Sequence, residues 1–190
     1  MIGRTLLASV VGAVVLMAWG FVFWTMTPLG QNLIHTIDTE DAVIEVLDQN
    51  ISESGVYFVP STGMRDKSGQ EAFVEKHRRG PLARISFRKE GADAQSPVVF
   101  IKGFVHSFLS VLLLVGIMIH ALPRLASYRS RVVFVLLVGV FAGFFTHLSD
   151  PIWFHSPLQH SLYYMDFHIL GWLFVGLALA PIIKPASAAK

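Results

Sequence analysis

The chain has 190 residues, of which 53% are hydrophobic and 15% are charged, against roughly 25% charged residues in a typical soluble domain. A formal net charge of +2 gives no support to nucleic-acid binding, and the absence of cysteine excludes disulfides, iron–sulfur clusters, thiolate metal sites and thiol catalysis. The composition is that of a protein whose solvent is largely lipid.

The first predicted element is a membrane-spanning helix over residues 5–24, long enough to cross a hydrocarbon core of roughly 30 Å at about 1.5 Å per residue. A cleaved secretory signal is the alternative, because Arg4 precedes the apolar run. We favour a retained signal anchor, since the run is longer than the apolar part of a signal peptide. It also ends in an aromatic cluster at 19–24 where cleavage would need small residues. Pro28 and Gly30 are expected to end the helix.

Residues 28–97 predict a small α+β domain. A helix is expected to begin after Asp38 or Thr39, with apolar side chains at helical spacing: Val43, Val46, Leu47 and Ile51. A short strand is predicted at 56–59 and a polar turn at 63–69.

A second short helix at 71–79 is expected to end at Gly80 and Pro81. It is followed by an alternating strand at 83–88 that has Ile85 and Phe87 on one face. A sheet of two strands is only marginally stable in water, so this domain is expected to pack against the membrane helices or against a partner protein.

Three more apolar segments, 98–122, 132–148 and 162–183, complete a predicted set of four membrane spans. The predicted fold is mainly α, a four-helix transmembrane bundle with an α+β cap inserted between the first two spans. The predicted domains are 1–27 for the first helix, 28–97 for the cap, and 98–190 for the remaining helices and tail.

The short loops predict the orientation. Basic residues fall on one side of the predicted spans: Arg4, Arg124, Arg129, Arg131, Lys184 and Lys190. The loop at 149–161, on the other side, has no lysine or arginine. The positive-inside rule therefore places both termini in the cytoplasm and residues 28–97 on the outer side, since long loops translocate largely regardless of charge.

Histidine and aspartate gather near the outer ends of the last three spans, and they are the candidate metal ligands: His106, His147, Asp150, His155, His160, Asp166 and His168. Imidazole and carboxylate without thiolate suit zinc or copper, and also iron or manganese. Haem is less favoured, and would need His106 paired with His147 or His168. No spacing matches a known ligand motif, and an interfacial or packing role for these histidines is the favoured alternative.

Two charges lie inside apolar segments, Lys102 in the second span and Asp166 in the fourth. Their depth and opposite sign favour a pair that holds the helices in register, or snorkelling to the interface. Gly139 and Gly143 form a small-xxx-small pair that predicts a close helix contact in the third span. A proton or ion path is less favoured, because the middle of the spans offers no further carboxylate.

Loose motifs occur along most of the chain, at 19–30, 40–43, 53–57, 80–81, 90–97 and 150–172. With these motifs the chain resembles a family of uncharacterised bacterial four-span inner-membrane proteins. The resemblance implies the bacterial inner membrane, with residues 28–97 in the periplasm, and it implies no activity. The outer loop here is richer in histidine than is usual for that family.

Two functions are therefore predicted. The favoured one is a structural or accessory membrane protein, without enzyme activity, that contacts lipid and other membrane protein subunits. The alternative is a membrane protein that binds a metal or haem near the outer surface. A transporter ranks third, because the spans contain no broken segment near the midplane.

Overall fold

The computed structural model describes residues 2–27, 33–61 and 67–185. Contacts divide the chain into two compact units, one formed by Met1–Ile34 and Gln95–Lys190 and the other by His35–Ala94. The first unit is helical and the second combines helices with a two-stranded sheet.

Among the described residues of the first unit, four helices are long and apolar enough to cross a membrane, which confirms the predicted number: α1 (Ile2–Met26), α4 (Pro97–Ala121), α5 (Tyr128–His147) and α7 (Leu158–Leu179). Their apolar windows are only 17–28% buried, so most of their large hydrophobic side chains face outward. An exposed apolar surface of this extent is what lipid covers, and the helices fit a multi-pass membrane protein. The predicted boundaries shift by a few residues at each end.

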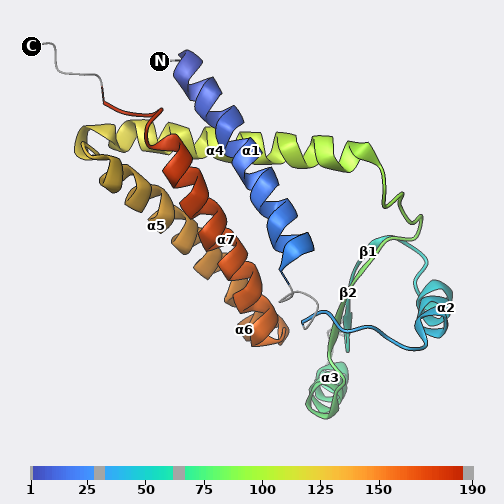
Figure 1. The fold of residues 1–190 in the computed structure, drawn as a ribbon. Helices are drawn as coiled ribbons and strands as arrows, with labels where there is room; N and C mark the ends of the chain where they lie inside the picture. The colour runs from blue at the N-terminus through green and yellow to red at the C-terminus, as the bar shows by residue number, and fades with distance from the viewer. Residues whose placement is uncertain (1, 28–32, 62–66, 186–190) are drawn as a thin grey trace, which may run out of the picture. The chain divides into compact units, whose positions relative to one another are not determined.

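Helices α5 and α7 lie side by side and run in opposite directions (Figure 1). Gly139 of α5 faces Trp172 of α7, and a β-carbon at Gly139 would lie 2.8 Å from the Cγ and Cδ1 atoms of the indole. Gly176 of α7 lies against Val132 and Val135 of α5 in the same way. The absence of a side chain at these positions lets the two backbones approach closely.

Helix α1 packs between α4 and α7. On the α4 side, the side chain of Val111 packs against Gly12. On the α7 side, the indole N–H of Trp19 donates a 3.0 Å hydrogen bond to the backbone carbonyl of Phe167. At the C-terminal end of α1, an aromatic cluster joins α1 and α7: Trp19, Phe23, Trp24, Tyr163, Tyr164 and Phe167. The core of the unit lies at the opposite end of α1, around Ala8, Val115 and Leu179.

The connection between α4 and α5 is shorter than the predicted 123–131. A single 3-10 turn, η2 (Leu122–Arg124), follows α4, and α5 begins at Tyr128. Ser127 and Ser130 form a reciprocal capping box at the start of α5, with the Ser130 amide donating to the Ser127 hydroxyl at 3.0 Å. Two serines three residues apart before an apolar run could have predicted this helix start.

Arg131, predicted as a loop residue, lies inside α5 and is only 6% exposed. Its Nε–H donates to the carbonyl of Ala180 at 2.9 Å, and its Nη1 donates to the carbonyls of Leu125 and Ala126 at 3.0 and 2.9 Å. The guanidinium therefore joins the end of α7 to the turn before α5. The negative end of the α7 dipole also favours a cation at this position.

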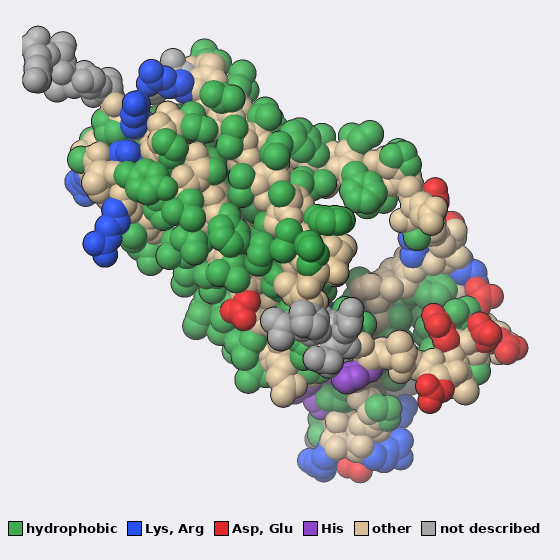
Figure 2. Space-filling model, viewed as in Figure 1, with side chains coloured by type: hydrophobic (Ala, Val, Ile, Leu, Met, Phe, Trp, Pro, Cys, Tyr) green, Lys and Arg blue, Asp and Glu red, His purple; other side chains and the backbone are tan. Residues whose placement is uncertain are grey.

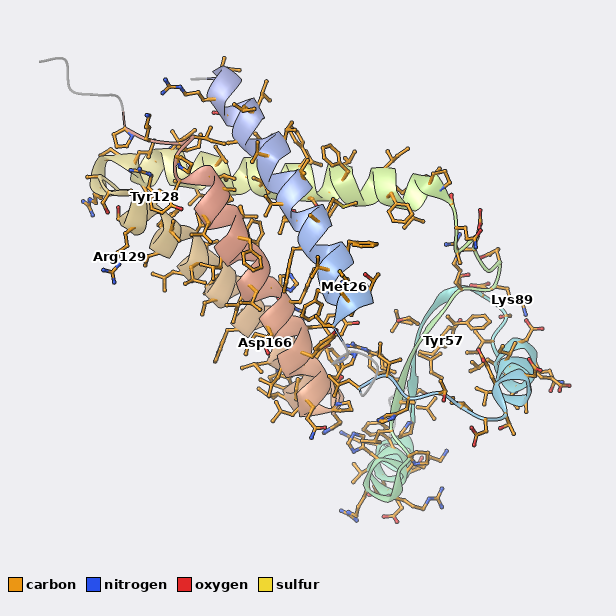
Figure 3. The ribbon with its side chains drawn as sticks, in the orientation of Figure 1. Met26, Tyr57, Lys89, Tyr128, Arg129 and Asp166 are labelled. Carbon is orange, nitrogen blue, oxygen red and sulfur yellow. The ribbon has the colours of Figure 1, made fainter. Side chains whose placement is uncertain are left out.

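Helix α7 ends at Leu179, two residues before Pro181 and four residues before the predicted end of the span at 183. Proline has no backbone N–H, so the carbonyl of Leu177, four residues earlier, loses its helical donor. The hydroxyl of Tyr128 donates to that carbonyl at 3.1 Å and replaces the missing bond. In Figure 3 Tyr128 and Arg129 are labelled at the start of α5, beside the end of α7.

The connection between the third and fourth spans, predicted as a loop at 149–161, contains helix α6 (Ser149–Phe154) and the first turn of α7. His155 has a φ of 54° and turns the chain between the two helices. The left-handed conformation closes α6, because the His155 amide donates to the carbonyl of Asp150.

The second unit contains α2 (Glu40–Asn50), β1 (Gly55–Val59), α3 (Lys67–Arg79) and β2 (Ala83–Phe87), which confirms the predicted elements and the two-stranded sheet. The strands pair in antiparallel register, with Tyr57 opposite Ile85. Thr39 lies at the predicted N-cap of α2, but its side chain makes no capping hydrogen bond. Helix α3 begins at Lys67, inside the stretch predicted as a polar turn; residues 62–66 of that turn lie outside the described residues.

Polar contacts tie the end of α2 to the residues that follow β2. The ammonium of Lys89, labelled with Tyr57 in Figure 3, contacts the carboxylate of Asp48 and donates to its backbone carbonyl at 3.1 Å. The hydroxyl of Ser54 donates to the carboxylate of Glu90 at 2.9 Å and accepts from the Lys89 amide at 2.9 Å.

The pKa of the Glu90 carboxyl is lowered, first by a hydrogen bond from its own backbone N–H and then by the Ser54 hydroxyl. A folded pKa below the unfolded one means that the contribution to stability is complete above the unfolded pKa and is lost as the pH falls through the folded pKa. We expect Ser54→Ala to raise the pKa of Glu90 toward its ordinary value, because one hydrogen bond to the charged form is removed. Titration of carbon-labelled glutamate by NMR measures this, with Ser61→Ala as the control; an unchanged Glu90 titration in Ser54→Ala would contradict it.

Candidate functional site

Two of the seven candidate ligands meet directly. His147 is the last residue of α5 and His168 lies in the third turn of α7. Nε2 of His147 is 2.9 Å from Nδ1 of His168, and the ring centroids are 4.7 Å apart. Both side chains are half-buried. The side-by-side packing of α5 and α7 produces this contact, and Gly143, one turn before His147, packs against His168 and Met165 of α7.

A third atom decides where the proton lies. Nδ1 of His168 is also 3.2 Å from the backbone carbonyl of Tyr164, and a carbonyl oxygen can only accept. The geometry therefore favours a proton on Nδ1 of His168, shared between the Tyr164 carbonyl and Nε2 of His147. In this arrangement the outer nitrogen of His168, Nε2, keeps a free lone pair. Only one proton fits between the two facing nitrogens, since a second would meet the first across 2.9 Å.

Aromatic and ionisable neighbours surround the pair. The ring of Tyr164 lies 5.9 Å from His147 and 4.6 Å from His160. The carboxylate of Asp150 and the imidazole of His160 are close enough to act on His147 electrostatically. His160 lies in the first turn of α7 and not in a loop, which corrects the sequence prediction. Four of the seven predicted residues are therefore gathered at the α5–α6–α7 end: His147, Asp150, His160 and His168.

The gathered groups do not form a preassembled metal site. In the described ranges, no three or more His, Asp or Glu side chains are arranged to hold a metal ion. Two imidazole nitrogens on one tetrahedral zinc, with Zn–N bonds of about 2.0–2.1 Å, lie roughly 3.3 Å apart. The observed 2.9 Å between the two histidines would need only a small separation to reach that value. Further ligands would have to come from rotated neighbours or from water.

The other three candidates lie elsewhere. His106 is exposed on α4, His155 is exposed in the turn between α6 and α7, and Asp166 is exposed on α7. Helix α4 packs mainly on α1, so the proposed haem pairing of His106 with His147 or His168 is not assembled in the described part of the chain.

The predicted Lys102–Asp166 pair is not formed within the described residues either. Both side chains are exposed, and the helices that carry them are not extensive neighbours: α4 packs on α1, whereas α7 packs on α5 and α1. Gly139 and Gly143 both lie at the α5–α7 contact, Gly139 against Trp172 and Gly143 against His168 and Met165.

Sequence reasoning missed Tyr164, whose carbonyl and ring both contact the histidine pair. The four-residue spacing between Tyr164 and His168 places them on one helix face, which was a usable signal. It also missed the buried hydroxyl of Tyr163, which has no hydrogen-bond partner among the described residues.

No family model, no curated protein and no solved structure matches this chain.

Proposed function

We propose that this chain is an integral membrane protein of structural or accessory type, a subunit or assembly partner of a larger bacterial inner-membrane complex. The four apolar helices cross the membrane with both termini in the cytoplasm, and the His35–Ala94 unit lies in the periplasm. The distribution of the basic residues in the short connections supports this orientation.

The observation that carries the proposal is the missing core of the His35–Ala94 unit. Among its described residues, Ile51 is the only buried hydrophobic side chain, and α2 has no buried residue. A domain of about 60 residues that folds alone buries roughly 60% of the surface of its unfolded chain. A unit that exposes its apolar side chains instead is expected to bury them against another protein.

One face of the sheet is the clearest contact surface of this unit. Val56 and Phe58 project from the same face of β1 and are 61% and 44% exposed. Their cross-strand partners are Ser86 and Arg84, so the apolar pair is bordered by polar groups. An apolar centre with a polar rim is the usual form of a protein–protein contact.

A photo-crosslinking amino acid at position 58 of the full chain tests the proposal in cells. We expect one dominant adduct with another membrane or periplasmic protein, and the same protein should be retained by the intact chain in mild detergent. Gln70, exposed on α3, is the matched position for a control probe. Equal labelling from both positions, or labelling by lipid and water alone, would contradict an accessory role.

A second candidate function is supported by the His147–His168 contact. Two imidazoles with free or easily freed nitrogens, next to His160 and Asp150, could bind zinc or copper. These four residues would be the ligands. Haem is not supported, because the two facing rings hydrogen-bond directly to each other.

Metal titration of the purified chain, carrying an affinity tag without histidine, tests this candidate. We expect His168→Ala to weaken zinc or copper binding at least about tenfold if the pair is a ligand set. His106→Ala is the control, since His106 lies on another helix and is exposed. Equal binding by both variants would exclude the histidine pair as the site.

A further inference from the structure

The lipid-facing surfaces of the four long helices differ in chemistry. Between Leu6 and Trp24 the exposed side chains of α1 are all apolar, and so are those of α5 between Val133 and Phe145. Helices α4 and α7 differ, because each carries a charged residue on its exposed face. These two residues are Lys102 and Asp166, which have opposite charges.

Each charge interrupts an apolar row. On α7, Asp166 lies one turn from Leu162 and one turn from Leu170, both 38% exposed. On α4, Lys102 is followed by His106 on the same face and then by apolar residues. Figure 3 labels Asp166 on α7, and Figure 2 shows that the bundle in the same view is mostly covered by hydrophobic side chains.

The two charges lie at similar depth. Because successive spans alternate in direction, α4 and α7 both begin at the same membrane face. Gly12 of α1 lies against both Val111 of α4 and Leu179 of α7, so these two residues mark one level. Lys102 is nine residues from Val111 and Asp166 thirteen from Leu179, or about 14 and 20 Å toward the outer ends of the helices at about 1.5 Å per residue. A lysine side chain can span the difference.

A carboxylate exposed to hydrocarbon is costly, and its short side chain reaches the interface less easily than a lysine does. Ionisable groups in membrane spans therefore pair with one another or face a polar cavity. Asp166 does neither within the described chain, and the helix with the complementary charge at matching depth is α4. The first six residues of α4, 97–102, are exposed on every side, so this end of the helix has room for a neighbour.

We propose that a second copy of this chain supplies the missing contact, with Lys102 on the α4 face of one copy paired to Asp166 on the α7 face of the next. The two helices run in the same direction, so once Lys102 and Asp166 are paired, Val105 of one copy and Leu170 of the other, each about one turn further along its helix, would be neighbours. The proposal uses the membrane insertion given above but not the accessory role. Membrane fractionation tests the insertion separately, so a failure of the proposed self-association can be told apart from a failure of the proposed membrane topology.

The absence of cysteine in the native chain allows a direct test by disulfide trapping. One tagged chain carries Val105→Cys and a second, differently tagged chain carries Leu170→Cys, so that Lys102 and Asp166 are both kept. We expect a crosslinked heterodimer after mild oxidation of membranes. A chain with Phe141→Cys, exposed on α5 at the depth of Leu170, replaces the Leu170→Cys chain in the control and should give little product.

Charge reversal then identifies the contact. Lys102→Asp in the Val105→Cys chain, or Asp166→Lys in the Leu170→Cys chain, should lower the crosslink yield about tenfold, the change expected for loss of one charged contact. The two reversals together should restore it. Thermal unfolding in detergent checks that each variant remains folded. A crosslink that is absent in the native-charge pair, or that survives either single reversal in a folded protein, would overturn the proposal.

Discussion

Replacing Arg131 with methionine is expected to lower the free energy of unfolding by about 3 kcal/mol. The guanidinium donates to three backbone carbonyls at 2.9–3.0 Å, and it is only 6% exposed. Methionine replaces the aliphatic stem of the arginine but has no donor, so the carbonyls of Leu125, Ala126 and Ala180 lose their partner. A hydrogen bond to a charged group is worth about 1.5–3 kcal/mol, and removal of the buried charge offsets part of the loss.

Thermal and denaturant unfolding in detergent measures the change. Arg129→Met is the matched control, because Arg129 is exposed two residues earlier in the same helix and should change stability by less than about 0.5 kcal/mol. Arg131→Lys should fall between the two, since an ammonium cannot reproduce the geometry of the guanidinium. Equal stability of the two methionine variants would show that the Arg131 contacts contribute nothing.

Replacing Gly139 with alanine is the second large effect that we expect. The new β-carbon would overlap the Cβ of Trp172, an atom bound directly to the α7 backbone that cannot rotate away. The helices must then separate, and overpacking of this kind costs about 1–3 kcal/mol. Separation would also disturb the hydrogen bond between His147 and His168 further along the same helix pair.

Gly143→Ala provides an internal control for that result. The same one-carbon addition at Gly143 meets His168 and Met165 at 3.5–3.6 Å, which is an ordinary contact distance. We therefore expect Gly143→Ala to fold with nearly unchanged stability. Unfolding curves for the two variants compare the sites directly, and similar curves would exclude close packing at Gly139 as the cause.

Much of the secondary structure could be predicted from the sequence. Four long apolar runs can only be helices in lipid, because every backbone polar group must be satisfied within its own segment. The elements of the His35–Ala94 unit followed from alternation at 83–88, helical spacing after Thr39 and the Gly80–Pro81 stop. Local rules of this kind do not depend on which elements become neighbours.

The neighbours themselves were decided only by the tertiary structure. In a soluble protein the packed face of a helix can be predicted, because the opposite face is polar. Lipid is as apolar as a protein core, so the lipid-facing and packed faces of these helices have similar sequences. The sequence therefore suggested a pair between Lys102 and Asp166, whereas α4 packs on α1 and α7 on α5. For the same reason the burial of Arg131 and the contact of His147 with His168 could not be foreseen from hydropathy. Both depend on small residues that bring α5 against α7, and their effect becomes visible only when the two helices are placed together.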